Sequence, residues 1–162
     1  MEALRLDCGG LFDVDEPGTM SPGEVRWRVH LASPPRVAYF LIATAAGRRR
    51  FWADSTRERE GLLELRFADG RMLRARVCER EPFRRFALEL AGGALLAFDL
   101  ASDGFGGTDL TLTETGVSAA GSEDRRAAWA ALLLALKAAA DFGVDLRHHD
   151  PRRSRDRGYV DV

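Results

Sequence analysis

Side chains that could do chemistry are concentrated in one short stretch, DSTRERE at positions 54–60. Side chains alternate between the two faces of a strand, so counting back from the apolar Leu63 turns Arg57 and Arg59 toward the interior. A guanidinium at the mouth of a cavity can bind a carboxylate or phosphate through two parallel hydrogen bonds. The stretch therefore predicts two arginines that hold the anionic group of a ligand.

A break in the strand at Gly61 would reverse this orientation and turn Glu58 and Glu60 inward instead. These two glutamates and the two arginines are the only suspects for catalysis, because the other positions expected to face the interior are apolar. A catalytic acid or base needs a buried or cleft position that moves its pKa toward working pH. A solvated edge of paired charges explains the same stretch without chemistry. We therefore assign no catalytic residue, and the balance leans against an enzyme.

The histidines and cysteines do not form a metal-binding or nucleophilic set. His148 and His149 are adjacent, so on an extended chain they point to opposite sides, and no further histidine or cysteine stands at zinc-ligand spacing. His30 alternates with apolar residues and should face water. Cys78 falls in the outward register of its strand with no histidine beside it, and we expect a free thiol. No metal and no cofactor are predicted.

Composition is that of one soluble globular domain. The 162 residues, 46% hydrophobic and 30% charged, are enough for a core, and the net charge of −1 creates no field that would attract nucleic acid or an anionic membrane. The basic run 48–50 is expected to be a solvated helix face. Two cysteines and no signal-peptide pattern favour a reducing compartment, so we predict a cytoplasmic protein without nucleic-acid or membrane partners.

The sequence predicts a long helix over residues 122–143, and this helix would position any functional site. Ser122 suits its N-cap, acidic residues follow in the first turn, and Gly143 suits a left-handed C-terminal position. Apolar side chains continue around the whole helix, so both of its sides need cover. We expect a sheet to cover the face that carries Trp129, Leu132, Leu133, Leu136 and Ala140.

The opposite face of this helix carries Leu134 and Phe142 and needs a second cover. The tail, residues 144–162, mixes opposite charges with a few apolar residues and is too charged for a strand of its own. The simplest hypothesis folds the tail back over this face. The competing hypothesis is a homodimer through the same face, with the tails exchanged.

The residues before the long helix predict a curved antiparallel sheet. Apolar residues alternate over 25–31, the Pro-Pro pair at 34–35 begins a short helix, and a second short helix follows over 47–52. Residues 63–112 then alternate as strands separated by hairpin turns. The predicted fold class is α+β, with six or seven strands around the C-terminal helix. Residues 1–23 are expected to be an accessory element, within a single domain of 162 residues.

Side chains expected to line a space between sheet and helix are aromatic or aliphatic, with the two arginines at the mouth: Trp27, Phe40, Trp52, Arg57, Arg59, Phe67, Phe86, Phe98, Trp129, Leu133 and Leu136. These residues suit a flat apolar ligand. At native packing density the same side chains could also fill the core and leave no space for one.

Several local strings occur in an order that resembles the SRPBCC superfamily, the START-related helix-grip fold. Within it, the chain is most similar to the bacterial branch that resembles the C-terminal domain of the heat-shock-protein-90 ATPase activator. The strings, all within residues 24–143, are SPPRVAYFLIAT (33–44), FWA (51–53), FADG (67–70), EREP (79–82), GGTDLTL (106–112) and AW (128–129).

The resemblance implies a cavity between sheet and long helix, which in many relatives holds an apolar ligand. We therefore favour non-catalytic binding of a hydrophobic or amphipathic small molecule. The activator branch implies an alternative, a chaperone-associated interaction domain, although the activator's other domain is absent here. The superfamily implies a third class, an enzyme similar to polyketide cyclases or aromatases.

Overall fold

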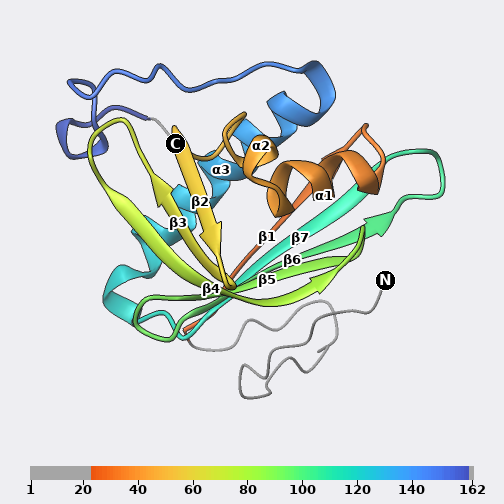
Figure 1. Ribbon diagram of the computed structural model, residues 1–162, viewed down its shortest axis with the longest axis horizontal. Coiled ribbons are helices and arrows are strands. Elements are labelled where there is room, and N and C mark those ends of the chain that lie inside the picture. The colour runs from red at the N-terminus through yellow and green to blue at the C-terminus, as the bar shows by residue number, and fades with distance from the viewer. Residues whose placement is uncertain (1–22, 161–162) are drawn as a thin grey trace.

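Antiparallel pairings join seven strands into one sheet, which bends around the C-terminal helix (Figure 1). The computed structural model describes residues 23–160, so the prediction for the accessory element lies almost wholly outside the described residues. In chain order the elements are β1 (Val25–Leu31), α1 (Pro35–Ala43), α2 (Ala45–Arg48), β2 (Ser55–Arg59), β3 (Leu62–Arg66), β4 (Met72–Glu81), β5 (Arg85–Leu90), β6 (Leu95–Ser102), β7 (Thr108–Thr115), the 3₁₀ turn η1 (Ala119–Gly121), α3 (Ser122–Phe142) and the 3₁₀ turn η2 (Arg155–Arg157).

The order of strands across the sheet is β1-β7-β6-β5-β4-β3-β2, which confirms the predicted α+β class. Only β1 pairs with a strand far away in sequence, and this pairing places Trp27 opposite Leu112. The concave face carries most of the large buried apolar residues of the sheet, as in the cross-strand pair of Phe86 and Phe98. Within residues 23–160, no helix combines the length and apolar character needed to cross a bilayer.

The turn between β2 and β3 decides which side chains of β2 face inward. Glu60 and Gly61 form a two-residue turn and both have positive φ, 52° and 77°. Glu58 is thereby paired with the inward Leu63, so Glu58 faces the interior while Arg57 faces outward. The predicted inward orientation of the arginines is wrong. The alternative is confirmed for Glu58 but not for Glu60, which occupies the turn itself.

The long helix α3 is anchored at its C-terminal end. Gly143 takes the predicted left-handed conformation, with φ 66°. The Asp141 carboxylate accepts hydrogen bonds from the backbone N–H groups of Ala32 and Ser33, both at 3.0 Å. At the other end Gly121, rather than the predicted Ser122, is the N-cap residue, because η1 runs directly into the helix.

The interior behind α3 is closely packed. Phe51, Phe86 and Phe98 have no exposed surface, and the ring of Trp52 meets that of Phe98 edge-on, with centroids 5.7 Å apart. Arg48 is also fully buried, so the prediction of a solvated basic helix face is wrong for this residue.

The C-terminal tail does not cover the outer face of α3. It runs from Gly143 across α2 toward the turn between β3 and β4 (Figure 1), and Arg147 donates to the backbone oxygen of Arg49 at 2.6 Å. Leu134 and Phe142 stay 60% and 74% exposed. Within one chain, the covering role predicted for the tail is therefore wrong, because backbone and charge partners hold the tail elsewhere.

Cys78 is buried and disulfide-bonded, so the expectation of a free thiol is wrong. Its side chain alternates with the inward Val77 and lies on the convex face of the sheet, the predicted outward side, against Ala87 and Ala97. The predicted cytoplasmic location loses its support from the cysteines and stays a prediction.

Candidate functional site

A cleft of about 500 Å³ opens between the N-terminal half of α3, β4 and the end of β5. Two tryptophans, one from each side, form its inner wall: Trp52 follows α2, and Trp129 lies on the sheet-facing side of α3. The cleft is lined by Trp52, Phe67, Arg71, Met72, Leu73, Arg74, Leu90, Ala91, Asp124, Arg125, Ala128, Trp129, Leu132 and Arg155. Aromatic and aliphatic walls of this kind accept a flat apolar group.

Four arginines surround this apolar wall. Arg71 lies over the ring of Phe67, 5.5 Å from its centroid, and Arg155 is contributed by η2 of the tail. Arg125 reaches in from the first turns of α3 and Arg74 from β4. Asp124 is the only acidic side chain that lines the cleft. Arg71, Arg74 and Arg125 pair with the carboxylates of Asp69, Glu64 and Glu114, so a carboxylate or phosphate attached to an apolar body would share these guanidiniums.

A buried carboxylate that the sequence reasoning missed lies behind this rim. Glu114 has no exposed surface, accepts a hydrogen bond from the indole of Trp129, and is 2.9 Å from the guanidinium of Arg125. The sequence does indicate this position, because Leu110 and Leu112 face inward and Glu114 follows at the same spacing of two residues. Glu114 does not itself line the cleft, so its visible role is to orient Trp129 and Arg125.

Three of the eleven predicted lining residues, Trp52, Phe67 and Trp129, line this cleft. Trp27 is half-buried beside the start of α3, and its indole donates to the backbone oxygen of Arg126 at 2.9 Å. Phe40 is exposed on α1. The other aromatic and aliphatic candidates fill the closed core: Phe86, Phe98, Leu133 and Leu136. Open space therefore remains at the mouth and not in the interior.

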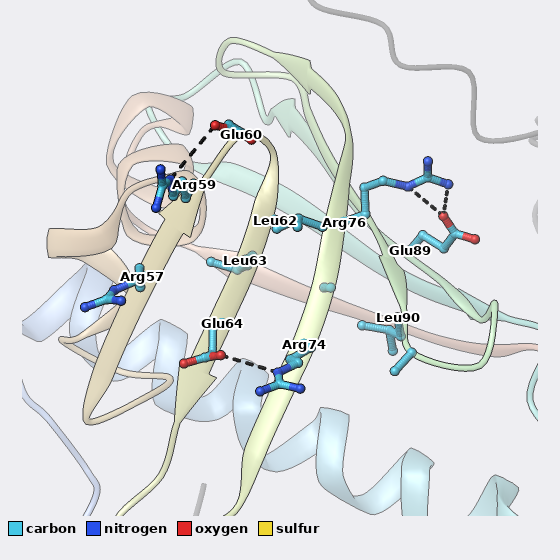
Figure 2. Close-up of a pocket in the computed structure, with 12 residues that line it drawn as sticks. Arg57, Arg59, Glu60, Leu62, Leu63, Glu64, Arg74, Arg76, Glu89 and Leu90 are labelled. Carbon is cyan, nitrogen blue, oxygen red and sulfur yellow. Dashed lines mark hydrogen bonds and ion pairs between the residues drawn. The ribbon is translucent and has the colours of Figure 1, made fainter.

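Arg57 and Arg59 line a different groove, of about 520 Å³, on the convex face of the sheet (Figure 2). Leu62 is exposed in the middle of this groove, while Arg74 and Arg76 extend from β4 on its far side. Figure 2 also shows the ion pairs that neutralise these two arginines of β4. The arginines predicted to bind a ligand in the interior are thus separated from the cleft by the sheet.

Glu58, one of the four suspects for catalysis, forms a structural ion pair with Arg48. Arg48 donates to Glu58 at 3.3 Å, to the Thr56 hydroxyl at 3.2 Å and to the backbone oxygen of Ile42 at 3.1 Å. Arg80 donates to the other carboxylate oxygen of Glu58. Burial lowers the pKa of Arg48, while Glu58 acts in the opposite direction and favours the charged guanidinium. Both oxygens of the Glu58 carboxylate are thus paired with arginines.

The two adjacent histidines of the tail are not directed at a common point. His149 contacts Asp54 through one ring nitrogen and Asp145 through the other, at 2.5 and 3.0 Å. His148 Nδ1 instead accepts from the backbone N–H of Asp150. Among residues 23–160, no group of three or more histidine, cysteine or acidic side chains is placed to hold a metal ion.

No family model and no curated protein matches this sequence. Several solved structures are similar to it in fold. Aha1 from Colwellia psychrerythraea, solved as a dimer, is 20% identical over 74% of this chain and 97% of its own, with a TM-score of 0.67. SSP2350 from Staphylococcus saprophyticus is 19% identical over 76% and 96%, with a TM-score of 0.68.

A third structure, DynU16 of the dynemicin biosynthetic locus, is 17% identical over 80% of this chain, with a TM-score of 0.70. Here the match spans about half of the neighbour, 51% of its length. The fold is the helix-grip fold. The resemblance drawn from the sequence, including that to the activator branch, is confirmed at the level of the fold. Identities this low establish nothing finer about this helix-grip chain.

Proposed function

We propose that this helix-grip domain binds an amphipathic small molecule with an anionic group, without catalysing a reaction. The observation that carries the proposal is the cleft beside α3, in which two tryptophans meet the guanidiniums of Arg125 and Arg155. Its volume of about 500 Å³ lies within the range of small-molecule sites, roughly 300–1,000 Å³. The apolar body would lie against Trp52 and Trp129, and the anionic group would face Arg125 and Arg155.

The test combines native mass spectrometry of the purified protein with titration of a defined probe. The probe is anilinonaphthalene sulfonate, a flat aromatic anion whose fluorescence rises on burial. Ala128→Trp fills the cleft and should weaken binding at least about tenfold, a cost of about 1.4 kcal/mol. Arg155→Ala removes one guanidinium from the rim and should weaken probe binding severalfold.

The matched control is Ala101→Trp, because Ala101 is exposed on β6, away from the cleft. Thermal unfolding verifies that each variant is folded. Equal probe binding by Ala128→Trp and the control would contradict the proposal. So would a purified protein that carries no small molecule and binds no probe.

One observation favours a second class, an acid–base enzyme similar to polyketide cyclases. Glu114 is a buried carboxylate directly behind the cleft wall, paired with Arg125. Turnover of a linear poly-β-ketone thioester, lost in Glu114→Gln while probe binding is retained, would support this class. Absence of turnover by the wild-type protein would favour binding alone.

The likeness to Aha1 supports the remaining alternative, a chaperone-associated interaction domain. Stimulation of a purified heat-shock-protein-90 ATPase by the chain would support this alternative, and an unchanged ATPase rate would exclude it.

We also propose a homodimer through the uncovered face of α3. Leu134 and Phe142 are exposed there, and Val144 and Leu146 of the tail are exposed as well. Exposed large apolar side chains are what an interface between subunits would bury. Aha1 was solved as a dimer, which supports a dimeric state for this chain but not a particular interface.

A further inference from the structure

The strand β2 lies at the edge of the sheet, outside the cleft, and most of its residues are exposed. It has a single neighbour in the sheet, β3, so one side of its backbone has no strand partner. All of its residues except Thr56 are exposed. Free strand edges can pair with another chain, and charged side chains on the edge restrict which chain that is.

The charges of β2 are compensated on one face only. On the inner face, Arg48 and Arg80 share the carboxylate of Glu58, whose side chain is 26% exposed. On the outer face, the Arg57 side chain is exposed and forms no hydrogen bond or ion pair within residues 23–160, although its backbone pairs with Glu64. Arg59 has a single acidic neighbour, Glu60, at 3.9 Å, and both side chains are about 85% exposed. The outer side of the edge therefore carries two arginines against one distant acidic neighbour and is positively charged.

Carboxylates elsewhere in the groove are already engaged. Glu64 stands opposite Arg57 in the register, but its side chain pairs with Arg66 at 2.8 Å and with Arg74 at 3.3 Å. Figure 2 shows Arg57 pointing away from this pair, and shows the Arg76–Glu89 pair on the far side of the groove. Among the described residues, Arg59 has only the long and exposed contact with Glu60, and the Arg57 side chain has no ion pair, so both guanidiniums are accessible to an external acid.

We propose that β2 is the docking edge for an acidic, extended segment of a partner protein, which adds to the sheet as an eighth strand. Side chains two residues apart on a strand lie on the same face, roughly 6.7 Å apart. Acidic residues at alternate positions of the segment would therefore face Arg57 and Arg59 together. Opposite charges in directly paired strands stabilise the pairing, whereas lysines there would repel it.

A protein segment fits this surface better than a lipid bilayer or a small acid. An anionic bilayer would also meet Glu60, Glu64 and Glu89 on the same face, whereas a peptide places its carboxylates one by one. A small acid would be poorly buried, because Leu62 in the middle of the groove is 62% exposed. One added strand makes a small interface, so the binding should be weak and sensitive to salt.

The test uses fluorescent peptides and the full-length protein, with binding measured by anisotropy. One peptide alternates glutamate with valine, and its partner alternates lysine with valine. The glutamate peptide should bind at least about tenfold more tightly than the lysine peptide. A version of the glutamate peptide that is N-methylated along one edge cannot donate backbone hydrogen bonds from that edge, and should lose at least about tenfold.

The matched protein variants are Arg57→Glu/Arg59→Glu and, as control, Arg36→Glu/Arg50→Glu. The control makes the same charge change at two exposed arginines away from β2. The β2 variant should lose at least about tenfold in affinity for the glutamate peptide, and the control less than about twofold. Both should unfold like the wild type, because all four side chains are exposed.

Three results would overturn the inference. The first is equal binding of the glutamate peptide by the two double variants. The second is unchanged binding after N-methylation. The third is that phosphatidylglycerol vesicles, and not the peptide, bind in an Arg57- and Arg59-dependent manner. Probe binding in the cleft is measured in parallel and should stay unchanged, so failure here is distinguishable from failure of the proposed ligand site.

Discussion

Arg48 is a charged residue that the sequence pattern places on the surface and the structure places in the interior. Its run of three arginines reads as a solvated helix face, but Gly47 lies so close to α1 that an added Cβ would be 2.2 Å from the backbone oxygen of Phe40. Arg48 follows this close contact and lies inward, where Thr56, Glu58 and the oxygen of Ile42 satisfy its donors. A buried charge persists only with such partners.

Arg48→Ala should therefore destabilise the protein by about 1–3 kcal/mol, because it leaves the backbone oxygen of Ile42 without this donor while Glu58 keeps Arg80 as a partner. Arg50→Ala, in the same run but exposed, should change the free energy of unfolding by less than about 0.5 kcal/mol. Urea denaturation of both variants measures the difference. Similar losses in the two variants would show that the network around Arg48 contributes little.

At the level of elements, the tail is held by charges that the sequence places far apart. Asp54 precedes β2, yet it pairs with His149 of the tail, which also contacts Asp145. Hydrogen bonds from Arg147 and contact with His149 outweigh burial and lower the pKa of Asp145 to about 2. The hydrogen bond with Asp54 is the main cause of the raised pKa of His149, and Asp145 adds to it, while burial and Arg147 oppose it.

Docking of the tail should accordingly depend on pH. A histidine whose pKa is raised in the folded state stabilises that state fully below its ordinary pKa of about 6.5, and this stabilisation is lost as pH rises through the raised value. We expect backbone amides near residue 149 to exchange faster at pH 9 than at pH 6, after correction for intrinsic exchange. His149→Asn should remove this dependence. A wild-type tail with constant protection across this range would contradict the assignment.

At the scale of the whole molecule, one apolar surface is left without a cover. The sheet buries one side of α3, while Leu134 and Phe142 on the other side stay exposed because the tail leaves toward α2. A second copy of the chain would bury this surface through a symmetric contact, since each copy presents the same patch.

Leu134→Glu should convert a dimer into a monomer, measured by sedimentation velocity at several concentrations. Leu62→Glu makes the same change at an exposed leucine on the convex face of the sheet and should leave the dimer intact. A wild-type chain that sediments as a monomer at high concentration would exclude the interface. Cleft binding should be retained in both variants.

Much of the architecture could be predicted because it depends on local periodicity. Alternation at period two, hairpin turns and the apolar helix 122–143 together predicted an antiparallel sheet around a C-terminal helix, and the structure has this arrangement. Of the site, the sequence identified Trp52, Phe67 and Trp129 as lining residues. It missed Glu114, although the alternation of β7 reaches that position.

The sequence by itself determined most strands and helices and which face of each is apolar, since these properties follow from neighbours along the chain, but it did not separate β2 from the strand that follows it. Only the tertiary structure decided that Arg57 and Arg59 face outward, because the two-residue turn at Glu60 reverses every side chain before it. Tertiary packing also decided where open space remains, since the volume left between α3 and the sheet depends on side chains from distant segments.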